Sequence, residues 1–262
     1  MLLLHGAMGG YDQAHHLGLA ALGPEGFRRI APSRPGYLGT PLARGTTPEQ
    51  QADLYAALLD ALSIARAAAI AVSGGGQSAL QFALRHPGRC SALVMISACS
   101  ATLTGPVPFR FRMMTLMARF PVLLAALNRR AAANPAALAR RAIPDPVLCE
   151  QTLRDPETGP LLRAHLASVS DRMPARLPGT RNDIANARAH FDYPLAAIAT
   201  PALIVHGTAD EAVPFAHAQR LAATLPGAEL LTIPGGMHTS LFTHRALIQA
   251  RVRTFIETNA RG

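Results

Sequence analysis

The chain has 262 residues and a formal net charge of +9, and 49% of its residues are hydrophobic. All 25 basic residues are arginines dispersed along the chain, and aromatic residues make up only 5%, which leaves few side chains on which nucleic-acid bases could stack. No apolar run reaches the ~20 residues of a membrane span, so we expect neither a nucleic-acid partner nor a membrane span. The length suits one domain of helices and strands with an insertion.

Short apolar strands and helices alternate up to about Ser97 and again near the C-terminus. This alternation predicts six strands, at residues 2–4, 28–31, 67–72, 92–96, 202–205 and 230–233. Thr47-Pro48-Glu49-Gln50 predicts the start of a helix, because threonine and glutamine at this spacing form a capping box and proline fits the first helical turn. The sequence therefore favours an α/β fold.

The third predicted strand ends in Ser73-Gly74-Gly75-Gly76, a serine among glycines before a predicted helix. Glycine allows a sharp turn and close approach of a substrate, and the following helix supplies N–H groups that stabilise negative charge. The run matches the Gly-x-Ser-x-Gly turn of serine nucleophiles, with Ala71 in place of the first glycine. A phosphate-binding loop is the alternative, but the run lacks Gly-x-Gly-x-x-Gly and the Gly-Lys-Ser/Thr ending. We predict that Ser73 is a nucleophile.

The alternation stops between about Ser100 and Tyr193, where ten prolines interrupt a segment rich in Ala, Arg, Leu and Met. This composition predicts several short helices. Whether Arg110, Arg112 and Arg119 are solvated or meet a substrate carboxylate is left open. We expect most of the apolar residues in this stretch to form the core of the segment and its seam with the main domain, and the alternative is that they line an apolar pocket: Phe109, Phe111, Met113, Met114, Leu116, Met117 and Phe120.

Two residues near the C-terminus stand where an acid and a base are expected. A serine nucleophile needs a base, and the base needs a carboxylate to orient it. Asp210 and His238 each follow the carboxyl end of a predicted strand, where open parallel sheets place their sites. Glu211 is the local rival of Asp210, whereas residues 97–104 contain no carboxylate. No pair of histidines stands at a metal-ligand spacing with a third ligand nearby, so we expect no metal and no cofactor.

The order Ser73, Asp210, His238 is that of the α/β-hydrolases, and the chain resembles this superfamily over nearly its whole length. Besides the turn at Ser73, five segments in the family's order carry the resemblance: residues 3–10, 33–39, 85–87, 206–210 and 235–238. The resemblance implies a three-layer α/β/α fold with a mostly parallel sheet of about six strands, without the family's N-terminal strands. It also implies a core at residues 1–98 and 196–262, a helical cap at residues 99–195, and an oxyanion hole formed by the backbone N–H groups of Ala7 and Gly74.

By this resemblance we expect a serine hydrolase that acts on an ester or similarly activated carbonyl of a small, apolar substrate through Ser73, His238 and Asp210 and an acyl-enzyme. Two alternatives stay open. One is hydrolysis of a carbon–carbon bond in a diketone by the same residues, and the other is a non-catalytic ligand-binding protein on a hydrolase scaffold. The expected partner is a small-molecule substrate. An odd number of cysteines without motif spacing, and no recognisable signal peptide, predict reduced thiols in the cytoplasm: Cys90, Cys99 and Cys149.

The start of the chain raises a separate question. The chain begins inside what the resemblance makes the family's third strand, so the predicted strand at residues 28–31 would lie at an open sheet edge. Two explanations are open: the gene begins upstream of Met1, or a homodimer covers the edge. We favour the first, because a strand of three apolar residues at a free terminus should fray.

Overall fold

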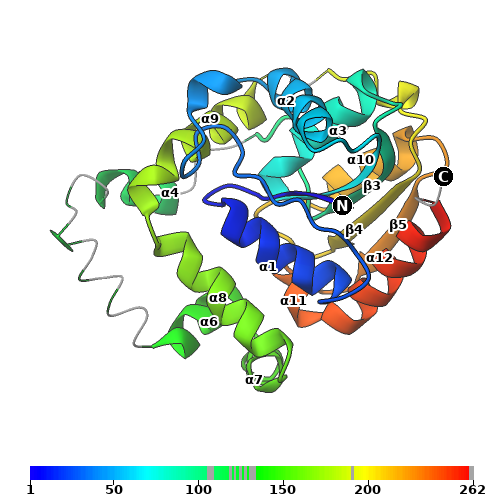
Figure 1. Cartoon of the computed structure of the whole chain (residues 1–262). Helices are drawn as coiled ribbons and strands as arrows, with labels where there is room; N and C mark the ends of the chain where they lie inside the picture. The colour runs from blue at the N-terminus through cyan, green and yellow to red at the C-terminus, as the bar shows by residue number, and fades with distance from the viewer. Residues whose placement is uncertain are drawn as a thin grey trace.

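A parallel sheet of five strands forms the centre of the computed structural model, which describes residues 1–104, 109–117, 134–189 and 192–259 together with Phe120, Val122, Leu123, Ala126 and Arg129. The strands lie side by side in chain order (Figure 1), every neighbouring pair is parallel, and their bounds are β1 (Leu2–Leu4), β2 (Ala67–Val72), β3 (Cys90–Ile96), β4 (Ala202–Gly207) and β5 (Glu229–Ile233). All five strands therefore end at the same edge of the sheet, which is where the candidate site residues follow them.

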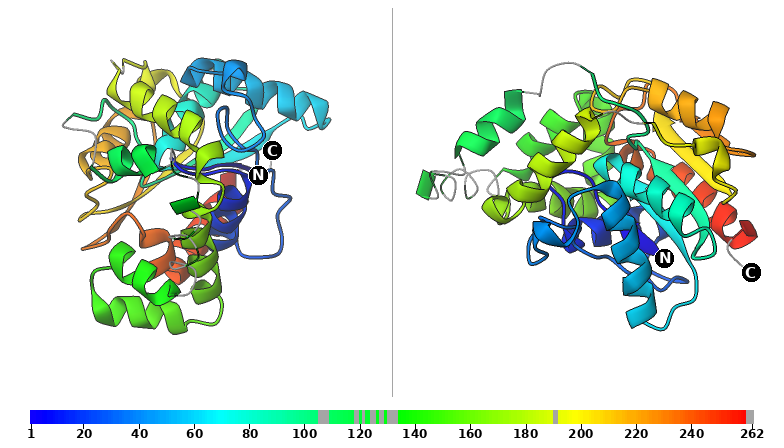
Figure 2. Two further views of the ribbon diagram at one scale, coloured as in Figure 1. Left: turned by 90° about the vertical axis from the view of Figure 1, so that its left-hand side faces the viewer. Right: turned by 90° about the horizontal axis from the view of Figure 1, so that it is seen from above.

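Helices cover both faces of the sheet, because successive strand residues point to opposite sides. In β2, Ala69 and Ala71 belong to one buried cluster, whereas Ala68 and Ile70 belong to the other. The first cluster is completed by α2 (Pro48–Ala61), α3 (Gly76–Arg85) and α10 (Ala216–Thr224), and the second by α1 (Tyr11–Leu22), α11 (Ser240–Thr243) and α12 (Arg245–Asn259). Figures 1 and 2 show the resulting three layers, which confirms the predicted α/β/α fold.

The predicted strand at residues 28–31 is wrong. Only Ile30 joins the sheet, through a single bridge to Leu2, with hydrogen bonds from Leu3 N to Ile30 O and from Ile30 N to Met1 O, each 2.8 Å long. Two features explain this. The neighbouring β1 has only three residues, and Pro32 has no N–H with which to continue the ladder. The sheet consequently has five strands where six were expected.

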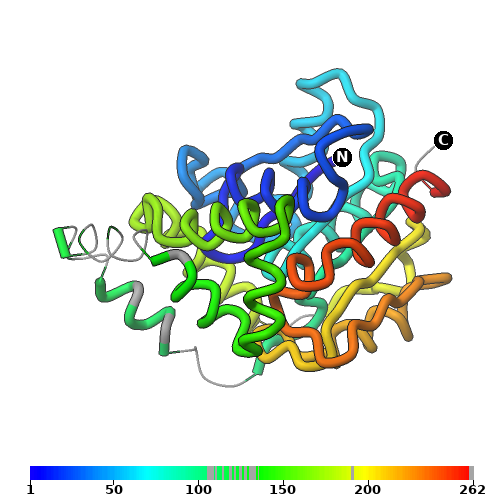
Figure 3. The backbone as a smooth tube through the Cα atoms, turned by 90° about the horizontal axis from the view of Figure 1, so that it is seen from below, coloured from blue at the N-terminus to red at the C-terminus, as the bar shows by residue number. Residues whose placement is uncertain are grey.

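The described part of the segment between β3 and β4 is helical. Its helices are α4 (Phe109–Met117), α6 (Pro135–Ala142), α7 (Pro146–Arg154), α8 (Thr158–Ser170) and α9 (Leu177–Arg188), together with two 3₁₀ turns at Met173–Ala175 and Leu195–Ala197. The helix α8 packs against α1 (Figure 3), α7 packs against α11, and α9 lies against the turn that carries Ser73. The segment therefore contacts the sheet domain at several places.

The apolar residues of α4 are largely exposed. Phe109 is 70% exposed, and Leu116 and Phe120 are about half exposed, so the expectation that they form the core of the segment is wrong for these residues. The physical reason is that apolar residues occur around the whole circumference of α4 and cannot share one buried face. Phe111 differs, because it packs against Met8, Met173 and Leu177. The side chains of Arg110 and Met114, and all of Arg119, lie outside the described residues.

All three cysteines are buried and unpaired. Burial raises the pKa of the Cys90 and Cys99 thiols to about 12, so neither is a thiolate near neutral pH. None of the described helices combines the length and the hydropathy that crossing a membrane requires. The cytoplasmic location expected from the thiols stays a prediction.

The capping box at the start of α2 is confirmed and can be tested by stability. The Thr47 hydroxyl accepts a hydrogen bond from Gln50 N, and the Gln50 side chain accepts one from Thr47 N. Thr47→Ala should lower the free energy of unfolding by about 1 kcal/mol, because a helix N–H loses its partner. Urea unfolding measures this loss. Thr258→Ala is the control, since its hydroxyl bonds only to a carbonyl within α12, and an equal loss in both variants would contradict the assignment.

Candidate active site

Ser73 lies on a strained turn between β2 and α3. Its φ angle of 53° is in the left-handed region, which non-glycine residues seldom adopt and which often marks functional sites. Gly6 lies so close that a Cβ on it would be 2.9 Å from Ser73 Cβ. The carbonyl of Ser73 accepts a hydrogen bond from Cys99 N at 3.1 Å, which ties the turn to the loop after β3. The serine is thus held at the carboxyl edge of the sheet in one backbone conformation.

Two backbone N–H groups lie next to each other beside Ser73. They belong to Ala7 and Gly74, and Ala7 N lies 3.4 Å from the position that a Cβ on Gly74 would take. The neighbouring N–H groups are occupied, because Met8 N donates to Thr180 Oγ1 and Gly9 N donates to Gly6 O. The structure therefore places Ala7 N next to Gly74, and the role of these two groups as oxyanion donors stays a prediction.

His5 fixes the direction of the Ala7 N–H group. Arg34 N donates to His5 Nε2 at 3.0 Å, so the ring proton is on Nδ1, which donates to Gly6 O at 2.8 Å. Burial, and then the nearby Arg34 charge, lower the pKa of His5 well below its usual value, so the ring stays neutral. In a trans peptide the C=O and N–H groups point in opposite directions. By holding the Gly6 carbonyl, His5 turns the Ala7 N–H away from it.

Asp210 and His238 form a hydrogen-bonded pair. Asp210 Oδ2 lies 2.8 Å from His238 Nδ1, and Asp210 Oδ1 accepts hydrogen bonds from Ala212 N and Val213 N. The Asp210 side chain is fully buried, whereas that of His238 is 34% exposed. Glu211, the rival carboxylate, is exposed. The pairing leaves Nε2 as the nitrogen of His238 that is free to exchange a proton with a substrate or nucleophile.

His206 is a neighbour of Asp210 that the sequence reasoning missed as a site residue. Its Nε2 donates to Val213 O at 2.8 Å and lies 3.5 Å from Asp210 Oδ2. Burial opposes ionisation of Asp210, but His206, His238 and the Val213 N–H group together lower the pKa of its carboxyl below the usual value. The available signal was its position four residues before Asp210.

Ser73 and His238, both within the described chain, do not form a hydrogen bond in this structure. Such contacts are often long when no substrate is bound and shorten in the reacting complex. The structure thus brings Asp210 to His238, and Ala7 to Gly74 beside Ser73, and leaves the serine–histidine contact open. No group of three His, Cys, Asp or Glu side chains within the described ranges is arranged to hold a metal, and the absence of a metal stays a prediction.

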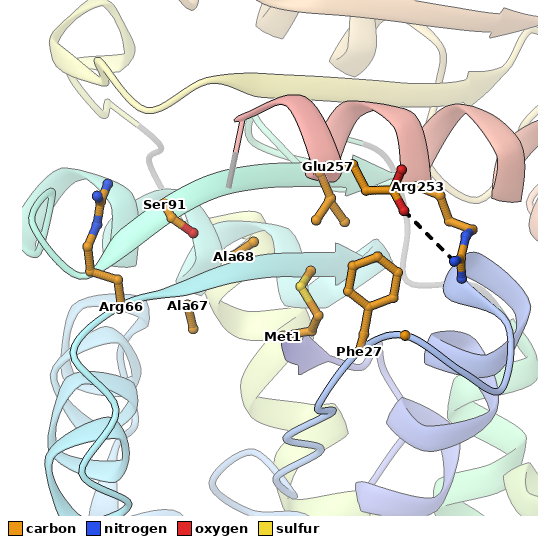
Figure 4. A pocket seen from close by; sticks show the side chains of 10 residues that line it. Met1, Phe27, Arg66, Ala67, Ala68, Ser91, Arg253 and Glu257 are labelled. Carbon is orange, nitrogen blue, oxygen red and sulfur yellow. Dashed lines mark ion pairs between the residues drawn. The ribbon is translucent and has the colours of Figure 1, made fainter. Parts of the chain in front are cut away.

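A hollow of about 400 Å³ lies at the opposite edge of the sheet (Figure 4). Its lining includes Met1, which precedes β1, Ala67 at the start of β2 and Ser91 near the start of β3. Because the strands are parallel, this edge holds their amino ends, whereas Ser73, Asp210 and His238 all follow carboxyl ends. The hollow is therefore separate from the candidate active site.

Comparisons with known proteins show which family and fold the chain shares. The family described as "Alpha/beta hydrolase family" matches residues 1–250. A solved structure, an alpha/beta hydrolase fold protein from Nakamurella multipartita, is 31% identical and superposes with a TM-score of 0.78 over 97% of this chain and 90% of that chain.

Three curated relatives are similar in sequence. The pimeloyl-[acyl-carrier protein] methyl ester esterase of Aromatoleum aromaticum is 32% identical over 84% of each chain. A 2-hydroxy-6-oxononadienedioate/2-hydroxy-6-oxononatrienedioate hydrolase of Burkholderia vietnamiensis is 26% identical over 98% of this chain and 86% of that protein. The uncharacterized hydrolase YcgS of Bacillus subtilis is 32% identical over 123 residues, and this match spans 47% of the chain and less than half (42%) of the relative.

The lowered pKa of Asp210 predicts a pH dependence of stability. A carboxyl whose pKa is lower in the folded than in the unfolded protein stabilises the fold above the unfolded value of about 3.9, and this contribution is lost as the pH falls toward the folded value. Wild type should therefore lose stability relative to Asp210→Asn as the pH is lowered from about 5 to about 3. Urea unfolding across this range measures the difference.

Glu211→Gln is the control for that series, because its carboxylate is exposed. Its stability should follow that of wild type at each pH. A gap between wild type and Asp210→Asn that stays constant down to pH about 3 would mean that Asp210 is not held ionised by its neighbours.

Proposed function

The chain belongs to the alpha/beta hydrolase family, and from this premise we propose that it is a serine hydrolase of carboxylic esters. The observation that carries the proposal is the joint arrangement at the carboxyl edge of the sheet. Ser73 lies on a left-handed turn with the Ala7 N–H group close to Gly74. At the same edge of the sheet, the buried Asp210 is hydrogen-bonded to His238. This combination supplies a nucleophile, a base with its orienting acid, and donors for an oxyanion.

In the proposed reaction the Ser73 hydroxyl attacks the ester carbonyl carbon while His238 Nε2 takes its proton. The carbonyl oxygen becomes an oxyanion, and the Ala7 and Gly74 N–H groups donate to it; a single such donor is worth ~2.7–4 kcal/mol in a comparable site. His238 then protonates the departing alcohol, which leaves an acyl-enzyme. Water, deprotonated by His238, attacks the acyl-enzyme and releases the acid and Ser73. Throughout, Asp210 holds the His238 tautomer and stabilises its cation.

The substrate class follows from the relatives only as a proposal. One relative's name describes a methyl ester esterase, which supports an ester as the reacting group. We propose that the cap, residues 99–195, selects the substrate, because Phe109, Met113 and Leu116 on α4 are exposed and so available for contact. The proposed substrate is therefore a small ester with an apolar part, and the enzyme needs no cofactor for this chemistry.

A second candidate reaction is hydrolysis of a carbon–carbon bond in a diketone. The observation that favours it is the similarity to the Burkholderia vietnamiensis hydrolase over nearly the whole chain. The same nucleophile, base and oxyanion donors would serve this reaction, with a carbanion in place of the alkoxide as leaving group. Ester hydrolysis remains the first proposal, since the identity to the esterase is higher.

The nucleophile is tested by covalent labelling. A fluorophosphonate probe should modify one serine, Ser73, because its turn and the nearby base activate it. Intact mass and peptide mapping identify the site. Ser73→Ala should abolish both labelling and ester turnover, and His238→Ala should reduce both by about 10³-fold or more.

Ser63→Ala is the matched control, since Ser63 also has a positive φ of 54° but stands at the end of α2 away from the candidate site. It should label like wild type. Labelling that persists in Ser73→Ala would overturn the assignment of the nucleophile, and a wild-type protein that is neither labelled nor active would support the ligand-binding alternative.

The substrate class is tested with a graded panel. p-Nitrophenyl esters of increasing acyl length should be hydrolysed, with kcat/KM rising with length through apolar contact, by up to about tenfold per buried pair of CH₂ groups. A ring-cleavage diketone, followed by loss of its absorbance, provides the comparison. Turnover of the diketone with no ester turnover would replace the first proposal by the second.

A further inference from the structure

A buried ion pair joins α9 to the loop after Ile30. Arg34 Nη1 donates to Asp183 Oδ1 at 2.9 Å, Arg34 Nη2 donates to Asp183 Oδ2, and the Tyr37 hydroxyl donates to the same Oδ2 at 2.5 Å. Arg34 is 1% exposed and Asp183 is 7% exposed. The carboxylate thus accepts two hydrogen bonds from one guanidinium. Both groups are removed from water, and Coulomb interactions are stronger in such a buried environment than in water.

This pair lies directly beside the candidate oxyanion hole. Asp183 Oδ2 lies 3.2 Å from the position that a Cβ on Gly74 would take, and Ala7 N lies 3.4 Å from the same position. Asp183 Oδ2 and Ala7 N therefore both lie beside Gly74. An uncompensated negative charge at this place would repel the oxyanion and oppose the effect of the two N–H groups.

Arg34 supplies the compensating charge. Burial alone would lower the pKa of its guanidinium, but Asp183 raises it above the ordinary value, so the group is cationic. Arg34 also holds the oxyanion loop, because its Nε donates to His5 O at 2.9 Å and its backbone N donates to His5 Nε2. The same residue therefore contacts the carboxylate and the loop that presents Ala7.

We propose that Arg34 is a positioning residue of the active site, whose charge cancels that of Asp183 and so keeps the site at Ala7 and Gly74 attractive to an oxyanion. Asp183 anchors α9 to Arg34 and Tyr37 beside the nucleophile turn, and its negative charge is compatible with an oxyanion there only because Arg34 neutralises it. The inference rests on the proposed function. It differs from a purely structural role, because it predicts that removing both charges is better than removing only the positive one.

The test is a charge cycle on kcat for an ester and on the rate of fluorophosphonate labelling of Ser73, with Tm measured in parallel. Arg34→Gln leaves Asp183 uncompensated and should lower both rates by about 30-fold or more. Arg34→Lys keeps the positive charge but loses the two parallel hydrogen bonds of the guanidinium, and both rates should stay within about fivefold of those of wild type. Asp183→Asn should stay within about threefold, because the remaining cation favours an oxyanion. In the double variant Arg34→Gln/Asp183→Asn both rates should be about tenfold higher than in Arg34→Gln, although the Tm of the double variant stays low.

A second ion pair provides a matched control. Arg176 is fully buried, donates to Asp12 Oδ2 at 2.5 Å and to Gly9 O at 2.8 Å, and likewise joins the inserted segment to the first loop. It makes no contact with Gly74 of the kind that Asp183 makes. Arg176→Gln should lower Tm comparably, and adding Asp12→Asn should give no recovery of either rate.

The possible results distinguish a failure of the proposed function from a failure of the role assigned to Arg34. A wild-type protein that hydrolyses no ester and takes no label on Ser73 overturns the proposed function and this inference with it. A labelled, active wild type whose double variant is as slow as Arg34→Gln overturns the inference alone and leaves the pair a structural role. If Arg34→Gln does not fold, Asp183→Asn decides: a loss of about 30-fold or more in that variant contradicts the proposal.

Discussion

The close crossing of three backbone segments at the end of β2 is the constraint on which the rest of the structure depends. A Cβ on Gly75 would lie 2.7 Å from Leu4 O, and a Cβ on Gly76 would lie 2.6 Å from Cys99 O. Because these neighbours are backbone atoms, they cannot move aside as a flexible side chain could. Only glycine lets the end of β1, the turn after β2 and the loop after β3 meet here. The strained conformation of Ser73 follows from that meeting.

The parallel sheet then brings the other two candidate residues to the same edge. A second close crossing holds them in place, because a Cβ on Gly207 would lie 2.1 Å from Gly236 O. Ala209 N donates to Gly236 O at 2.9 Å, which joins the loop after β4 to the loop after β5. The Asp210–His238 hydrogen bond is therefore supported by backbone contacts on both sides, and it does not depend on side-chain packing alone. Pre-organised geometry of this kind lowers the reorganisation that a reaction requires.

The sequence predicted the parts of the molecule whose signals are local. The glycine run at Ser73, the capping box at Thr47 and the apolar strands depend on residues a few positions apart, and the structure contains the turn, the capping box and five of the six predicted strands. The strand predicted at residues 28–31 did not form, because its local composition suits a strand but its only neighbour, β1, has three residues. Asp183 carried no signal, because its partner Arg34 is 149 residues away along the chain and the intervening residues contain no pattern that links them.

Two helices of the inserted segment differ in their contacts: α9 is tied to the sheet domain, whereas α4 has exposed apolar side chains. At its start Arg176 is paired with Asp12, its N-terminal turn is in backbone contact at Gly179 with Gly36, and its middle carries Asp183. Moving α9 away from the sheet domain would separate two buried arginines, Arg34 and Arg176, from their carboxylate partners at once. Breaking buried ion pairs in this way is strongly destabilising. The helix α4, by contrast, presents Phe109 and Leu116 to solvent. A rearrangement of the insertion would therefore break fewer buried contacts at α4 than at α9, and under the proposed function α4 is the part that could adapt to a substrate while α9 holds the proposed oxyanion site in place.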